Sequence, residues 1–176
     1  MSFIQTLSGN HIDYRNISHD AICIEDIATA LSHACRFAGH LPEFYSVAQH
    51  SVLVSQLVPG EFAFEALMHD AAEAYCCDIP APLKALLPDY REIERYVDSV
   101  IREKYGLPAE HSQVVKYADL IMLATERRDL DIDDGTRWPY LDGISPTEHF
   151  TITPLSPSQA STLFINRFNE LEGRAA

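Results

Sequence analysis

Apolar residues recur at helical spacing along most of the chain. From Glu25 to about Ala38 they fall one or three positions apart and form one stripe of an amphipathic helix, which we expect to end at Gly39. The same kind of pattern predicts further helices over about 46–57, 83–87, 90–105, 111–130 and 157–171. The segment from about Glu61 to Tyr75 is apolar on almost every side, which indicates a central helix enclosed by the others.

The first residues alternate between apolar and polar side chains around a turn at Ser8-Gly9-Asn10, which predicts a β-hairpin. No internal repeat or linker interrupts the helical pattern that follows. We therefore expect an all-α helical bundle with a small N-terminal β-hairpin, folded as one domain over residues 1–176. Its parts would be the hairpin in 1–15, a helical core in 25–130, and a C-terminal loop and helix in 131–176.

The chain carries 26 acidic and 13 basic side chains, which gives a formal net charge of −13. This charge repels a phosphate backbone at long range, so we expect no nucleic-acid polymer among the partners. A small phosphate ligand would need a bound cation and local lysine or arginine to reverse the potential. The sequence has no long apolar run and no charged segment followed by an apolar one at its start, which predicts a cytoplasmic protein without a membrane span or secretory signal.

Ionisable residues interrupt the apolar segments at a few positions. His69 and Asp70 lie in the middle of the apolar central segment, and Glu73 follows one turn later. A buried carboxylate is costly unless it is paired, and this segment holds no cation, so a metal ion is one way to supply the charge. By itself a His-Asp pair is most often a satisfied pair on a helix surface. His50 and Asp119 also lie among apolar residues, and mixed histidine and carboxylate donors suit a divalent ion better than a structural zinc finger.

The order His50, then His69-Asp70, then Asp119 resembles the signature of the HD-domain phosphohydrolases, an all-helical superfamily of metal-dependent phosphatases and phosphodiesterases. Three further segments look like those of its compact subgroup of bacterial 5′-deoxynucleotidases and their phage or prophage relatives, which include phage enzymes that remove phosphates from dATP. These segments are Arg36-Phe37 ahead of 46–51, then 69–74, then 78–84. The resemblance covers about residues 1–130.

The resemblance implies a ligand set of His50, His69, Asp70 and Asp119 for one divalent metal ion, with cobalt, manganese or zinc as the expected metals. Four protein ligands would leave room on an octahedral ion for water and a phosphate oxygen. Because relatives in the subgroup are oligomeric, the resemblance also implies a homo-oligomer. The expected partner is a deoxynucleotide substrate, with no nucleic-acid polymer and no membrane.

Two acidic residues are candidate catalytic groups. Glu73 is not needed as a ligand, so it could orient the attacking water or move its proton; the alternative is a hydrogen bond that holds a ligand histidine. Asp78 matches an aspartate that lies near the sugar and the leaving oxygen in the resembled subgroup. The alternative for Asp78 is to cap the turn that follows it.

Four residues are candidates for substrate binding. Arg36 offers a planar fork that matches phosphate oxygens, and Lys84 and Lys116 would add positive charge, although both could be ordinary surface lysines. Phe37 stands where relatives carry a tryptophan thought to crowd the ribose 2′ position. Phe37 could also block a hydroxyl there, or it could belong to the core.

Together these features favour a phosphohydrolase that removes phosphate from deoxynucleotides, such as dAMP or dATP, by attack of a metal-activated water. One alternative is a phosphodiesterase acting on a cyclic or signalling nucleotide, against which stands the match from Arg36 to Lys84. Another is a nonenzymatic, metal-stabilised prophage accessory protein. Glu73 and Arg36 argue against that alternative, because neither is required to hold a metal.

Overall fold

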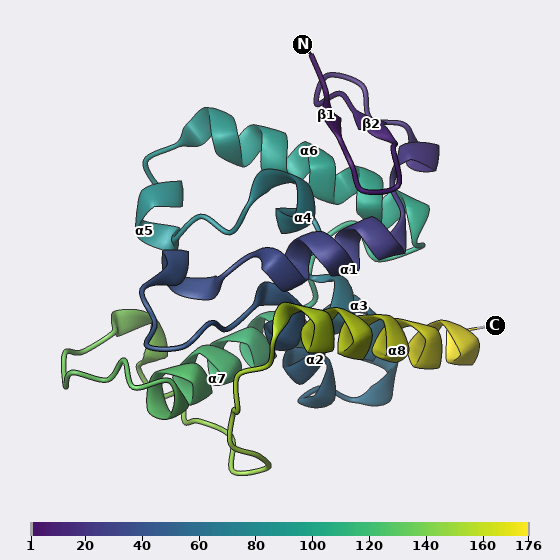
Figure 1. Ribbon diagram of the computed structural model, residues 1–176. Helices are drawn as coiled ribbons and strands as arrows, with labels where there is room; N and C mark the ends of the chain where they lie inside the picture. The colour runs from purple at the N-terminus through teal and green to yellow at the C-terminus, as the bar shows by residue number, and fades with distance from the viewer. Residues whose placement is uncertain (1, 176) are drawn as a thin grey trace.

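The computed structural model describes residues 2–175, and most of them are helical (Figure 1). This confirms the expected all-α fold with a small N-terminal hairpin. The α-helices are α1 Ile24–His33, α2 Val47–Gln56, α3 Ala63–Met68, α4 Glu73–Cys76, α5 Ala81–Lys84, α6 Pro88–Lys104, α7 Gln113–Asp129 and α8 Pro157–Ala175, and the strands are β1 Ile4–Gln5 and β2 His11–Ile12. None of the helices in the described part of the chain has the length and apolarity needed to cross a membrane.

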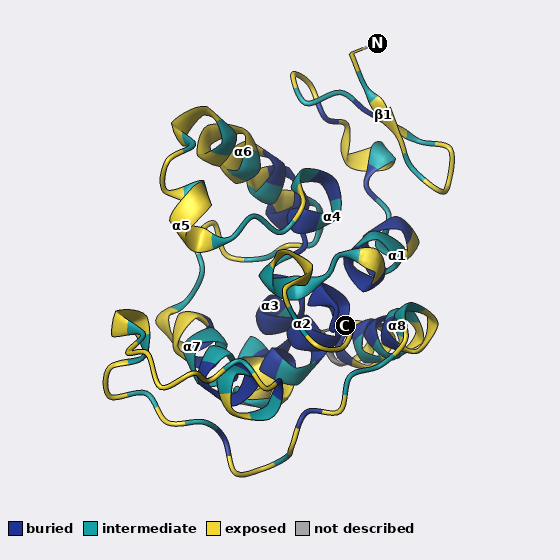
Figure 2. Ribbon diagram, turned by 60° about the vertical axis from the view of Figure 1, so that its left-hand side comes forward, coloured by how far each residue is buried: buried dark blue, intermediate teal, exposed yellow. Residues whose placement is uncertain are grey.

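Helix α2 lies at the centre of the fold, in contact with α1, α3, α7 and α8. Figure 2 shows α2 and α3 almost wholly in the colour of buried residues, whereas α5 and α6 expose most of their surface. Ser46 begins α2 as predicted, because its side chain accepts a hydrogen bond from the Gln49 amide. Burial of the apolar faces around α2 is the main stabilising contribution, at about 25 cal/mol for each Å² removed from water.

The hairpin forms around the predicted turn. Ile4 lies opposite Ile12, and Gly9 supplies the positive φ that the turn requires. Ile12 is fully buried, and both the amide and the hydroxyl of Ser8 donate to Asp26 of α1. These contacts fix the hairpin to the end of α1, at the edge of the molecule (Figure 1).

The first helix ends earlier than its apolar pattern predicts. α1 stops at His33, and residues 36–39 form a separate turn in which Phe37 and Ala38 have positive φ angles of 55° and 52°. The backbone before this turn pairs with the start of α2 instead: the Arg36 amide donates to the Tyr45 carbonyl at 2.9 Å, and the Val47 amide donates to the Ala34 carbonyl at 3.0 Å. These long-range bonds replace the helical ones, so the expected helix end at Gly39 was wrong.

The predicted central helix is interrupted at its polar residues. α3 ends at Met68, residues 69–72 form tight turns, and α4 resumes at Glu73. Within the interruption the amides of Ala71 and Glu73 bond to carbonyls three residues earlier, as in a 3₁₀-helix. The segment is nevertheless enclosed as predicted, since Leu67, Met68 and Ala71 are buried.

Candidate metal centre

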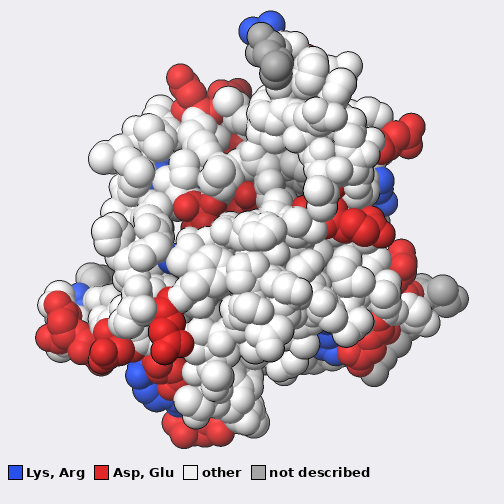
Figure 3. Space-filling model, viewed as in Figure 1, with Lys and Arg blue, Asp and Glu red and all other residues white. Residues whose placement is uncertain are grey.

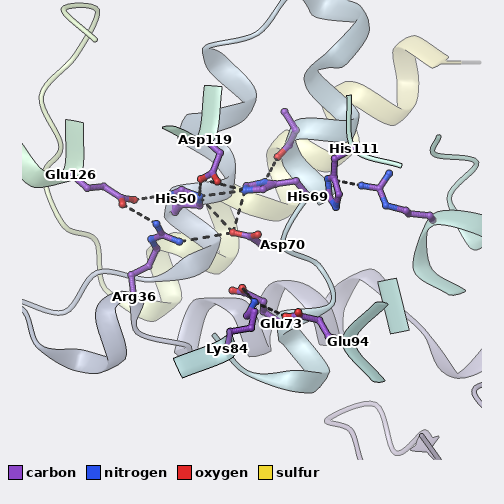
Figure 4. Close-up of polar contacts among 12 residues, drawn as sticks. Arg36, His50, His69, Asp70, Glu73, Lys84, Glu94, His111, Asp119 and Glu126 are labelled. Carbon is purple, nitrogen blue, oxygen red and sulfur yellow. Dashed lines mark hydrogen bonds and ion pairs between the residues drawn. The ribbon is translucent and has the colours of Figure 1, made fainter. Parts of the chain in front are cut away.

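Three side chains from separate parts of the fold converge on one point (Figure 4). His50 comes from the middle of α2, His69 follows α3, and Asp119 comes from α7. The Nε2 atom of His50 is 3.4 Å from Nε2 of His69 and 3.2 Å from Oδ1 of Asp119. One ligand atom from each residue lies within 4.8 Å of the others, so the group could hold a metal ion.

Asp70 adds a fourth candidate ligand atom to this cluster. Its Oδ2 atom is 3.5 Å from Nε2 of His50 and 3.2 Å from Nε2 of His69. Two ligands that are each about 2.1 Å from a metal ion lie about 3.0 Å apart in octahedral geometry and about 3.4 Å apart in tetrahedral geometry. The spacings within the cluster therefore suit a small divalent ion at its centre.

The hydrogen bonds of the two imidazoles assign their tautomers. Nδ1 of His69 lies 2.8 Å from the carbonyl oxygen of Ala66, which can only accept, so Nδ1 carries the hydrogen. Nδ1 of His50 lies 2.6 Å from Oε1 of Glu126, which favours the same tautomer. In the neutral rings both Nε2 lone pairs then face the cluster, where two carboxylate oxygens also point. Such a set of facing acceptors fits a cation.

The pKa directions agree with this need for positive charge. Burial lowers the pKa of His69 by itself, but the neighbouring Asp70 and Asp119 outweigh it and raise the pKa well above its usual value. Burial likewise opposes ionisation of Asp119, yet its polar contacts with the imidazoles of His50 and His69 hold its pKa well below the usual range. The site therefore favours anionic carboxylates around a positive centre, which protons or a metal ion can supply.

Glu126 is a site residue that the sequence analysis missed. It is fully buried in α7, and its second oxygen, Oε2, accepts from Nη2 of Arg36 at 2.9 Å. Burial opposes ionisation of Glu126, but Arg36 and His50 outweigh it and lower its pKa. Nη1 of Arg36 also lies 4.0 Å from Oδ2 of Asp70, so both terminal nitrogens of its guanidinium face acidic groups of the site. A glutamate seven residues after Asp119, on the same helix face, was the available signal.

Glu73 lies beside the cluster and turns toward Lys84, whose Nζ is 3.7 Å from Oε1 of Glu73 and 2.6 Å from Glu94 (Figure 4). Glu73 lines the same cleft as His69 and Asp70. Oε2 of Glu73 is buried and has no hydrogen-bond partner among residues 2–175. Burial, with Asp70 and Asp78 adding to it, raises the pKa of Glu73 well above its usual value.

A cleft of about 230 Å³ opens next to the cluster. Its walls come from the interrupted central helix, from α5 and α6, and from the connection that leads to α7. The lining residues are His69, Asp70, Ala72, Glu73, Lys84, Glu94, Arg95, Asp98 and His111. Acidic groups also outnumber basic ones on the molecular face shown in Figure 3. A ligand that enters the cleft therefore meets His69 and Asp70 of the cluster at one wall, and Lys84 and Arg95 as the positive side chains at the others.

Three further predicted residues lie outside the four-residue cluster. Asp78 is half-buried; burial raises its pKa, and the charge of Arg36 opposes that rise. The Phe37 ring lies 5.4 Å from the Arg36 guanidinium and 6.5 Å from the Trp138 ring, so it packs beside the site. Lys116 is exposed on α7, and no contact joins it to the four cluster residues in the part of the chain that the structure describes.

Comparison with known proteins gives relatives but no activity. No protein-family model matches the chain. The chain is 67% identical over 171 residues to an uncharacterized Escherichia coli protein, YfdR, an alignment that covers 97% of this chain and 96% of YfdR. It is 34% identical over 122 residues to an uncharacterized Rhodobacter capsulatus protein, covering 64% of this chain and 62% of that protein. At this identity and coverage, the chain belongs to the same family as Escherichia coli YfdR.

Proposed function

We propose that this protein is an HD-type, metal-dependent phosphohydrolase that removes phosphate from deoxynucleotides. The observation that carries the proposal is the meeting of His50, His69, Asp70 and Asp119 beside a cleft that His69 and Asp70 help to line. These residues occur in the order typical of the HD superfamily, which the sequence resembles. A proposed deoxynucleotide would place its phosphate at the cluster and its nucleoside toward the rest of the cleft or the Phe37 side.

The donor set fits a divalent ion, and cobalt, manganese and zinc are the proposed metals. When bound, such an ion would polarise a phosphoryl group and lower the pKa of a coordinated water. The protein would hold the ligand atoms in place through the bonds from His50 to Glu126 and from His69 to the Ala66 carbonyl. Partners of this kind fix the orientation of a metal-binding imidazole.

Glu73 is the proposed group that handles the proton of the attacking water. It is buried at the cleft wall, one of its oxygens is uncommitted among the described residues, and Lys84 stands 3.7 Å from the other. A carboxylate in this position can accept a proton from water and pass it on, a contribution of about 10²–10⁴-fold in rate. Asp78, whose pKa burial raises, is proposed to give a proton to the leaving oxygen.

Arg36 and Lys84 are the proposed sources of positive charge for the phosphate. Arg36 lies against Asp70 and Glu126, so its charge acts at the edge of the cluster. Lys84 lines the cleft directly, although Glu94 neutralises part of its charge. Lys116 would contribute only at longer range because it lies on the exposed face of α7.

A substrate panel tests the proposal. Purified protein is incubated with deoxy- and ribonucleoside mono- and triphosphates in the presence of cobalt, manganese or zinc, and released phosphate is measured. We expect hydrolysis of at least one deoxynucleotide that depends on added metal. No release across the panel by protein with confirmed metal occupancy would reject the proposal.

The variant Glu73→Gln separates an enzyme from a metal-stabilised accessory protein. As an enzyme, E73Q should keep its metal and lose at least about 100-fold in turnover, because the amide cannot accept the proton. The matched control is Glu92→Gln, which removes an exposed glutamate of α6 and should leave turnover unchanged. Equal turnover of E73Q and wild type would remove Glu73 from the mechanism.

A further inference from the structure

The cleft contains a histidine that the proposed mechanism does not use. His111 lies in the connection between α6 and α7 and lines the cleft together with His69 and Asp98. Its side chain is 30% exposed, so a ligand in the cleft can reach it. In Figure 4 it stands beyond His69, on the side away from Asp119.

A buried arginine determines which nitrogen of His111 carries its hydrogen. Nη2 of Arg102 lies 2.6 Å from Nδ1 of His111, and a guanidinium can only donate. Nδ1 must therefore offer a lone pair, which leaves the hydrogen on Nε2. Burial and the nearby charge of Arg102 both lower the pKa of His111, in agreement with a neutral ring.

The Nε2 hydrogen of His111 has no close acceptor among the described residues. Oδ2 of Asp98 is 3.7 Å from Nε2, which is too long for a hydrogen bond, and this oxygen already accepts from Nε of Arg102 at 2.8 Å. The tautomer is thus the opposite of that in His50 and His69, whose Nε2 atoms present lone pairs. His111 is built as a donor, and the two cluster histidines are built as ligands.

The segment that carries His111 is held on both sides. Arg102, only 2% exposed, also donates to the Pro108 carbonyl at 2.6 Å. On the other side, the Ser112 amide donates to the buried Glu65 at 2.6 Å. These bonds fix the backbone next to His111, so its direction toward the cleft does not depend on a bound ligand.

We propose that His111 is a substrate-binding residue whose Nε2–H donates to a phosphoryl oxygen of the ligand in the cleft. A neutral hydrogen-bond donor suits this position. The cleft already contains the acidic side chains of Asp70, Glu73, Glu94 and Asp98, which repel an anion. A bound phosphate therefore needs direct hydrogen bonds as well as positive charge. The inference rests on the proposed function for the identity of the ligand as a phosphate ester. Its binding step can be tested without turnover.

The kinetic test compares His111→Leu with His111→Gln on the best substrate of the panel. A hydrogen bond to a charged group contributes about 1.5–3 kcal/mol, so H111L should lose about 10–100-fold in kcat/KM, mainly through KM. H111Q should recover most of this loss, because its amide N–H can occupy nearly the place of the imidazole Nε2–H. The control His149→Leu removes an exposed histidine that lines a different pocket and should change neither constant.

The binding test uses ¹⁵N NMR of the histidine rings in zinc-loaded protein titrated with inorganic phosphate. We expect a neutral His111 ring with hydrogen on Nε2, and a shift of that nitrogen on adding phosphate. If H111L folds and keeps the wild-type KM, or phosphate leaves the His111 signal unmoved, the inference is wrong. If no nucleotide is hydrolysed but phosphate shifts the His111 signal, the proposed function fails and the anion-binding role of His111 stands.

Discussion

The hydrogen bonds that Glu126 accepts beside the cluster can be tested by replacing its carboxylate with an amide. The variant Glu126→Gln keeps the shape of the side chain and removes its charge. In the wild type, Glu126 accepts from Arg36 at 2.9 Å and from His50 at 2.6 Å, and all three side chains are buried or nearly so. The variant therefore leaves the Arg36 guanidinium without its close counter-charge.

The size of the effect follows from these two bonds. Each charge-assisted hydrogen bond contributes about 1.5–3 kcal/mol, and the amide oxygen can still accept one of them. We therefore expect E126Q to lose about 3 kcal/mol of stability, near the lower end of what breaking a buried ion pair costs. Because the orientation of His50 is also less well fixed, metal affinity should fall about 10–100-fold.

Two measurements check this prediction. Urea unfolding of metal-free protein gives the stability difference, and calorimetric titration with cobalt, manganese or zinc gives the affinity. The control Glu148→Gln removes a glutamate that is 92% exposed and lies 3.6 Å from Arg128, so it should change stability by less than about 0.5 kcal/mol. Metal affinity of E126Q within twofold of wild type would refute the role assigned to Glu126.

Three further predictions concern strain, pH and metal. Cys77 has φ 68° and ψ 154°, a region that glycine adopts freely, so C77G should raise stability by about 1 kcal/mol in urea unfolding; a loss would contradict the strain argument. Burial opposes ionisation of Asp129, but Arg128 and the Ile152 amide outweigh it and lower its pKa, so its stabilising contribution is present above about pH 4 and is lost as pH falls through the folded-state pKa. D129N should thus be about 1 kcal/mol less stable than wild type at pH 7, with a gap that narrows below about pH 4; a gap that does not change with pH would contradict this. Removal of the bound metal by a chelator should lower the melting temperature of the wild type. Adding metal back at 100 times its Kd should restore about 2.7 kcal/mol of folding stability. The melting temperature of an H69A protein should not depend on metal.

Local signals were enough to predict much of the fold. Ser46 marked the start of α2 because capping depends on residues only a few positions away. The alternation around Gly9 likewise predicted the hairpin. The end of α1 was mispredicted because Ala34 and Arg36 bond to backbone that follows some ten residues later, and no local pattern reveals that pairing.

The site was predictable to the extent that its residues stand out against apolar neighbours. His50, His69 and Asp119 did, and the structure brings them together. Glu126 did not stand out, because it lies near the charged end of α7 and its importance comes from Arg36, which is 90 positions away in the sequence. The tightening of the chain at residues 69–72, between α3 and α4, was not predicted either, because the apolar sequence continues through it.

Anomalous diffraction from a cobalt-loaded crystal shows directly whether these side chains bind one metal ion. We predict one strong peak about 2.0–2.3 Å from Nε2 of His50, Nε2 of His69 and a carboxylate oxygen of Asp119, with Asp70 as the fourth ligand. A cobalt-loaded crystal with no peak among these side chains, or with its only strong peak elsewhere on the chain, would contradict it.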